Sequence, residues 1–96
     1  MKTFQLGNTG EQVSALCLGA MYYGSSVAPE QAYRLLDQYV DHGGTFIDTA
    51  NIYSHWVEGF MGGESETLLG KWMKERKNRE RLFIASKVGF GYGTVP

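Results

Sequence analysis

One stretch of the sequence decides the fold, Thr45-Phe46-Ile47-Asp48-Thr49-Ala50, a short apolar run that contains a carboxylate and is followed by Tyr53. A second run, Leu82-Phe83-Ile84-Ala85-Ser86-Lys87, ends in a lysine. Short apolar runs of this kind are typical of buried strands in a parallel sheet. Because the carboxyl ends of such strands meet at one edge, we expect Asp48, Tyr53 and Lys87 to lie close together.

Two amphipathic helices separate the predicted strands, which are Ala15–Leu18, Thr45–Asp48 and Leu82–Ser86. The first helix begins at Pro29 and ends at His42-Gly43-Gly44, where His42 interacts with the last carbonyls and glycine supplies a left-handed cap. Its expected apolar stripe is Ala32, Leu35, Leu36, Tyr39 and Val40. The second helix carries acids (Glu64, Glu66) in its first turn and bases (Lys74, Arg76, Lys77) in its last. Its expected buried face is Leu68, Leu69, Trp72 and Met73.

This alternation predicts an α/β protein whose parallel sheet is built from βαβ crossovers. Lys2–Leu6 and Gln12–Leu16 precede it as a β-hairpin around the turn Gly7-Asn8-Thr9-Gly10. Cys17, inside an apolar run, is expected in the core. Periodicity alone does not separate a barrel from an open doubly wound sheet.

The composition limits the function classes. The 96 residues fit one small domain, with 43% hydrophobic and 20% charged residues and a formal net charge of −1. The sequence has no basic stripe that would indicate nucleic-acid binding. No run approaches the roughly 20 apolar residues of a membrane helix, and no metal site is expected. The start lacks the apolar region of a secretory signal, and the single cysteine excludes an intramolecular disulfide. We therefore expect a cytoplasmic protein, and the sequence indicates no oligomeric state.

The motifs Phe46-Ile47-Asp48-Thr49-Ala50-Asn51-Ile52-Tyr53-Ser54 and Leu82-to-Gly89 resemble the aldo-keto reductase family. The opening Phe4-to-Gly24 segment is similar to that family's first hairpin and first barrel strand. The family has a catalytic Asp, Tyr, Lys and His on a TIM barrel, and Asp48, Tyr53 and Lys87 match three of these. The resemblance implies that residues 1–96 are the N-terminal part of a (β/α)₈ TIM barrel preceded by a β-hairpin. This is an incomplete domain of three strands and two intervening helices, because a barrel needs roughly 250 residues.

The resemblance implies an NADPH-dependent oxidoreductase that reduces an aldehyde or ketone to an alcohol. Lys87 beside Tyr53 would lower the phenol's pKa, Asp48 would offset the lysine charge, and Tyr53 would donate its proton to the carbonyl oxygen as hydride arrives. Met21, Tyr22 and Asp48 would contact the NADP(H) nicotinamide–ribose region. The family's histidine and phosphate-binding loops belong to later strands, so the chain alone is expected to be inactive.

The expected substrate is a small carbonyl compound or an open-chain sugar, bound in a mouth lined by aromatic and imidazole side chains, namely Tyr22, Tyr23, His55 and Trp56. Two other functions stay open. A non-catalytic barrel fragment or accessory subunit would act by partner binding, and binding would survive Lys87→Met. A Schiff-base aldolase would use Lys87 as a nucleophile, and borohydride would trap its substrate.

Overall fold

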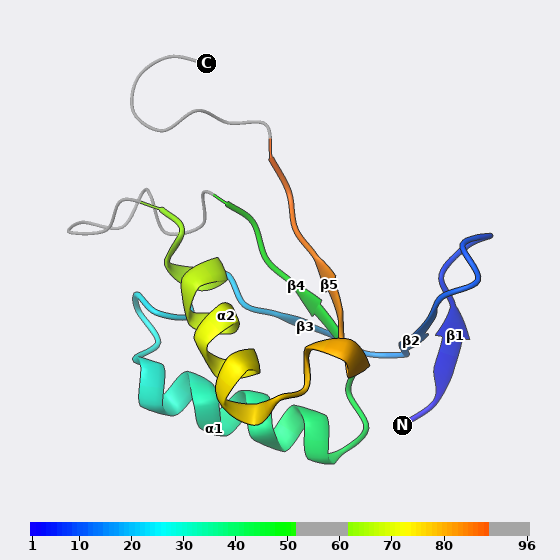
Figure 1. Cartoon of the computed structure of the whole chain (residues 1–96), viewed down its shortest axis with the longest axis horizontal. Coiled ribbons are helices and arrows are strands. Elements are labelled where there is room, and N and C mark those ends of the chain that lie inside the picture. Colours follow the sequence, from blue (N-terminus) through cyan, green and yellow to red (C-terminus); the bar gives the residue numbers. More distant parts are fainter. Residues whose placement is uncertain (52–61, 89–96) are drawn as a thin grey trace.

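A computed structural model of the chain describes residues 1–51 and 62–88 (Figure 1). Its elements in chain order are β1 (Thr3–Gln5), β2 (Gln12–Ser14), β3 (Cys17–Gly19), α1 (Pro29–Asp41), β4 (Phe46–Asp48), α2 (Glu64–Arg76), the 3₁₀ turn η1 (Arg79–Arg81) and β5 (Phe83–Ala85). Within these residues, no helix has both the length and the apolar character needed to cross a bilayer.

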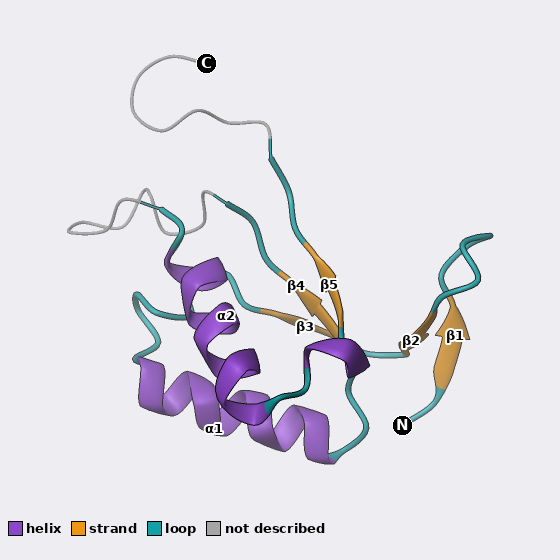
Figure 2. Cartoon of the chain, in the orientation of Figure 1, coloured by secondary structure: helices purple, strands orange, loops and turns teal. Residues whose placement is uncertain are grey.

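A parallel sheet of order β3-β4-β5 forms the centre of the molecule. The register aligns Gly19 with Asp48 and Asp48 with Ala85, so that the three strands end in one row. Both helices cover the same face of this sheet, and the β1–β2 hairpin lies apart from them (Figure 2). The prediction of a hairpin followed by a parallel α/β unit is therefore confirmed.

The core lies between the sheet and the two helices. Ile47 at the middle of β4 is fully buried and belongs to one cluster with Leu36 of α1 and Trp72 of α2. Leu18 and Ile84, the register partners of Ile47, pack against the same cluster. Its other buried members are Ala20, Tyr23, Ala32, Leu68, Leu69 and Leu82. Each central strand residue thus faces the helices, as the alternation of side chains along a strand requires.

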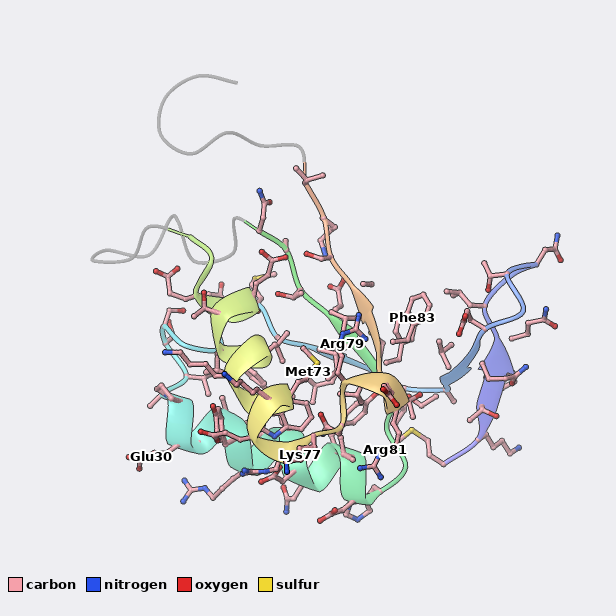
Figure 3. The ribbon with its side chains drawn as sticks, viewed as in Figure 1. Glu30, Met73, Lys77, Arg79, Arg81 and Phe83 are labelled. Carbon is pink, nitrogen blue, oxygen red and sulfur yellow. The ribbon has the colours of Figure 1, made fainter. Side chains whose placement is uncertain are left out.

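The flanking strand residues face away from the helices. The rings of Phe46 and Phe83 meet edge to face there, with centroids 5.7 Å apart and an interplanar angle of 83°. In Figure 3 Phe83 points away from α2, whereas Met73 lies between α2 and the sheet. Cys17 is exposed, so its predicted place in the core is wrong. The reason is the period of two: Leu18 points toward the helices, and its neighbour must point to the other face.

Helix α1 has the predicted ends. Pro29 occupies the first turn, His42 Nδ1 lies 2.8 Å from the Gln38 carbonyl oxygen, and Gly43 has a φ of 91°. Its buried stripe is narrower than predicted, because Ala32 and Leu36 are fully buried but Leu35 is 38% exposed. A helix turns by about 100° per residue, so Leu35 is carried to the rim of the stripe that Leu36 centres.

Helix α2 carries Glu64 and Glu66 in its first turn and Lys74 and Arg76 in its last. Lys77, predicted in the last turn, lies one residue beyond the helix end as a left-handed C-cap with a φ of 54°. The predicted buried face is confirmed for Leu68, Leu69 and Trp72, while Met73 is partly buried. The charge distribution complements the helix dipole at both ends.

The strands are shorter than predicted where the hairpin joins the sheet. The Ala15 amide donates to the Lys2 carbonyl, and the Leu16 carbonyl accepts from the Tyr39 hydroxyl. These bonds remove residues 15 and 16 from the parallel ladder, so β3 begins at Cys17 rather than at Ala15. The Tyr39 oxygen also lies within hydrogen-bond distance of Ser14 Oγ and of the Phe46 amide and carbonyl.

Candidate active site

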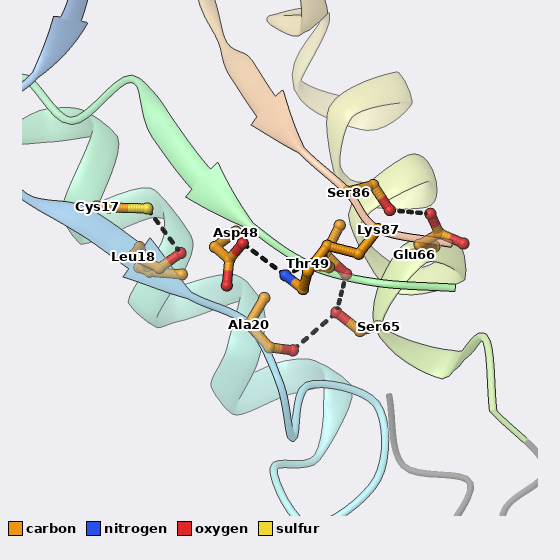
Figure 4. Close-up of polar contacts among 9 residues, drawn as sticks. All are labelled: Cys17, Leu18, Ala20, Asp48, Thr49, Ser65, Glu66, Ser86 and Lys87. Carbon is orange, nitrogen blue, oxygen red and sulfur yellow. Dashed lines mark hydrogen bonds and ion pairs between the residues drawn. The ribbon is translucent and has the colours of Figure 1, made fainter. Parts of the chain in front are cut away.

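Asp48 and Lys87 come together beyond the carboxyl end of the sheet. Lys87 Nζ lies 2.7 Å from Asp48 Oδ1 and donates a second hydrogen bond of 2.7 Å to the Thr49 carbonyl (Figure 4). Their side chains are 40% and 51% exposed, respectively. Both members of the pair are thus described residues and remain partly accessible from solvent.

Backbone pairing beyond the strand ends explains how residues 39 positions apart meet. The Thr49 amide donates to the Ala85 carbonyl at 2.8 Å, and the Asn51 amide donates to the Lys87 carbonyl at 3.1 Å. These bonds continue the β4–β5 ladder past the assigned strands. Asp48 and Lys87 are thus held on two neighbouring segments of the chain whose relative register is fixed.

Three predicted site residues lie in the loop after β3. Met21 and Tyr22 are 37% and 43% exposed, and the Tyr22 carbonyl accepts from the Ser25 and Val27 amides in a tight loop. Tyr23 is only 8% exposed and belongs to the core, where burial raises the pKa of its hydroxyl. Met21 and Tyr22 thus leave part of their side chains exposed, whereas Tyr23 contributes to packing.

The remaining predicted site residues are Tyr53, His55 and Trp56, which lie outside the described residues. Among residues 1–51 and 62–88, no three His, Cys, Asp or Glu side chains are arranged to hold a metal ion.

The Cys17 thiol, on the face of the sheet away from the helices, responds to the charges of Asp48 and Lys87. Partial burial raises the pKa of its thiol, the Asp48 carboxylate raises it further, and the Lys87 ammonium lowers it. The Asp48 carboxylate, at the end of β4, and the Lys87 ammonium, two residues beyond β5, thus both act on the Cys17 thiol. A group placed on this face experiences both members of the pair.

A buried hydrogen-bond chain beneath the Asp48–Lys87 pair was not foreseen from the sequence. Ser65 Oγ donates to the Ala20 carbonyl at 2.7 Å and lies 2.6 Å from Thr49 Oγ1. Ser65 and Thr49 are 0% and 1% exposed, respectively. A signal was present, because Ser65 precedes Leu68, Leu69 and Trp72 by three, four and seven positions. A serine on the apolar stripe of a helix requires a polar partner inside the protein.

The aldo/keto reductase family model matches residues 15–96. The chain is 42% identical over 85 residues to an uncharacterized 11.2 kDa protein of Pseudescherichia vulneris, covering 88% of this chain and 82% of that protein. It is 44% identical over 88 residues to norsolorinic acid reductase B of Aspergillus parasiticus, covering 84% of this chain but 21% of the reductase.

A solved aldo-keto reductase of Bacillus halodurans, in its holo form, superposes with a TM-score of 0.75 at 34% identity. The match covers 93% of this chain and 26% of that structure. The chain therefore spans only a fraction of these two reductases, although it covers most of the small bacterial relative. The solved neighbours are (β/α)₈ barrels, and the hairpin and β3–β5 unit correspond to the N-terminal part of such a barrel. This chain belongs to the aldo/keto reductase family.

Proposed function

We propose that this chain contributes three of the four catalytic residues of an NADPH-dependent carbonyl reductase. Tyr53 is the proton donor, Lys87 stabilises the tyrosinate that proton donation leaves, and Asp48 holds Lys87. The observation that carries the proposal is the 2.7 Å contact between Lys87 Nζ and Asp48 Oδ1 at the end of the sheet.

The chemistry of these groups suits proton donation. A tyrosine is a weak acid near neutral pH, and an ammonium group beside it favours the anion. The Asp48 carboxylate balances the ammonium charge and limits the positions that Lys87 can occupy. Family membership and reductase relatives support assigning Tyr53 as the acid that completes this group.

We expect the loop after β3 and the Asp48–Lys87 pair to contact the nicotinamide end of a cofactor. Tyr22 offers an exposed aromatic face, Met21 offers a thioether, and the part-exposed Asp48 carboxylate can accept hydrogen bonds from ribose hydroxyls. NADPH, the family's usual cofactor, would supply the hydride when bound. Its phosphate would be held by later parts of the barrel, so we expect the isolated 96-residue chain to show no turnover.

The geometry favours this role over a Schiff-base aldolase. Lys87 donates hydrogen bonds to a carboxylate and to the Thr49 carbonyl. Both bonds use protons of the ammonium group, whereas attack on a carbonyl carbon requires the lone pair of a neutral amine. We therefore assign Lys87 an electrostatic role, and the proposed substrate is a small aldehyde or ketone.

The decisive experiment measures NADPH oxidation with a small aromatic aldehyde by the purified protein that carries this chain. Tyr53→Phe and Lys87→Met should each lower kcat by about 10²-fold or more, the range for loss of a proton donor. Lys71→Met, on the exposed side of α2, is the matched control and should retain activity. Lys87→Met activity within twofold of the parent would overturn the proposal.

A further inference from the structure

Residues in the first turn of α2 form hydrogen bonds at the ends of all three strands, beside the candidate site. Ala20, Thr49 and Ser86 each directly follow the last residue of β3, β4 and β5. Ser65 contacts the first two, and Glu66 accepts a 2.5 Å hydrogen bond from Ser86 Oγ. Figure 4 shows these contacts around the Asp48–Lys87 pair. Two consecutive residues of α2 therefore contact all three residues that directly follow the strands.

The number of protons on each hydroxyl determines which group donates and which accepts in these buried hydrogen bonds. A serine hydroxyl has one proton, and that of Ser65 is donated to the Ala20 carbonyl. The Thr49 hydroxyl must therefore be the donor in its 2.6 Å contact with Ser65 Oγ. Each hydroxyl has one defined role in this chain, so neither can rotate without leaving a buried polar group unsatisfied.

Thr49 connects the buried hydrogen bonds of Ser65 to Lys87. Its hydroxyl is held by Ser65, its amide donates to Ala85, and its carbonyl accepts from Lys87 Nζ. Holding the Thr49 side chain and amide limits the directions that the Thr49 carbonyl can take. The Lys87 ammonium is then placed by two acceptors, the Asp48 carboxylate and an oriented backbone oxygen.

We propose that Ser65 is a positioning residue which, through Thr49, sets the place of the Lys87 ammonium beside Asp48. Its catalytic consequence rests on the proposed reductase function, in which Lys87 acts on Tyr53. The positional part stands on the contacts alone. Glu66 assists from the other side by holding Ser86, the residue before Lys87.

The test compares Ser65→Ala and Thr49→Val with two controls. Each removes one hydroxyl of the buried chain, and Thr49→Val keeps the shape of the side chain. Thr49→Ser retains the hydroxyl and should behave like the parent. Trp72→Phe removes a different buried donor of α2, the indole Nε1 that bonds Asp37 at 2.9 Å, and leaves the first turn untouched.

The first readout is the NMR cross-peak of the Lys87 ammonium group in ¹⁵N-labelled protein. Hydrogen bonds slow the exchange of ammonium protons, so the parent, Thr49→Ser and Trp72→Phe should show the peak. Ser65→Ala and Thr49→Val should broaden or lose it. An unchanged peak in both variants would overturn the positional proposal, and Thr49→Val keeps the test decisive if Ser65→Ala does not fold.

The second readout is the pH dependence of kcat for carbonyl reduction. A looser Lys87 stabilises the tyrosinate less, so the alkaline limb should move up by about half a pH unit in Ser65→Ala and Thr49→Val. Trp72→Phe should leave the limb in place. If Lys87→Met itself leaves kcat unchanged, the reductase mechanism fails while the NMR result still decides the positional role. If Lys87→Met is inactive but Ser65→Ala and Thr49→Val match Trp72→Phe, the catalytic part of the positioning proposal fails instead.

Discussion

Arg76 on α2 donates two hydrogen bonds to Asp37 on α1, from Nε to Oδ1 and from Nη2 to Oδ2, each 2.9 Å long. Asp37 Oδ1 also accepts from Trp72 Nε1, and the Arg76 guanidinium lies 5.5 Å from the centroid of the Tyr33 ring. One carboxylate thus joins the two helices that cover the sheet. The hydrogen bonds from Arg76 lower the pKa of Asp37, partial burial opposes them, and the Trp72 bond and the Arg76 charge add to the lowering.

We expect Asp37→Asn to destabilise the protein at neutral pH and to lose this effect in acid. The native pKa lies below the unfolded value of about 4, so the carboxylate's contribution is complete above that value. It disappears as the pH falls through the native pKa. Denaturant unfolding of parent and variant between pH 7 and pH 2 measures the difference, which should shrink below about pH 4. A difference that grows in acid would contradict the assignment.

Two adjacent leucines in α1 should respond very differently to truncation. Leu36 is fully buried, so Leu36→Ala should lower the unfolding free energy by about 2–5 kcal/mol. Leu35 is 38% exposed, and Leu35→Ala should cost less than about 1 kcal/mol. Thermal or urea unfolding distinguishes the two. Equal losses would mean that the buried stripe of α1 is wider than the structure indicates.

Two glycines form a second matched pair. A Cβ at Gly44 would collide with the Tyr39 ring, so Gly44→Ala should destabilise by about 1–3 kcal/mol. A Cβ at Gly70, inside α2, would meet no atom within 4 Å. Gly70→Ala should therefore stabilise by about 0.5–1 kcal/mol through the lower backbone entropy of the unfolded chain. Melting temperatures should move in opposite directions, and a loss at both positions would disprove this account.

Alkylation of Cys17 should measure the charges of the candidate site. Because Asp48 raises the pKa of the thiol, Asp48→Asn should increase the iodoacetamide rate at pH 8 by about two- to fivefold, allowing for solvent screening. Lys87→Met should decrease it, since Lys87 lowers the same pKa. Glu30→Gln, an exposed acid in the first turn of α1 that does not act on this thiol, is the charge-matched control. A parent-like rate in both site variants would place Cys17 outside their field.

Much of the fold could be predicted because local patterns and tertiary structure agree here. Pro29 and Gly43 mark the ends of α1, and the apolar middle of each strand faces the helices. The convergence of Asp48 and Lys87 followed from the rule that parallel strands end at one edge. These features depend on spacing along the chain, which a sequence displays directly.

Other features depend on which partner a residue meets. The exposure of Cys17 follows from the register of β3, and the short start of that strand follows from the Ala15 and Leu16 backbone bonds. Ser65 lies between Glu64 and Glu66, the two acids that mark the helix start, yet its hydrogen-bond partners are 16 and 45 residues away. The place of Ser65 on the apolar stripe indicates that it needs a polar partner, but a single sequence does not say which residues supply it.

The Tyr39 hydroxyl has a consequence for how the chain assembles. Its partners include Phe46, seven residues away, as well as Leu16 and Ser14, which are 23 and 25 residues away. Closing the short loop costs less entropy than closing the long ones, so α1 and β4 can meet before the hairpin arrives. The hydrogen bonds of the Tyr39 hydroxyl with Ser14 and Leu16 then form last. Early folding of this chain would accordingly begin in its middle and spread toward its N-terminus.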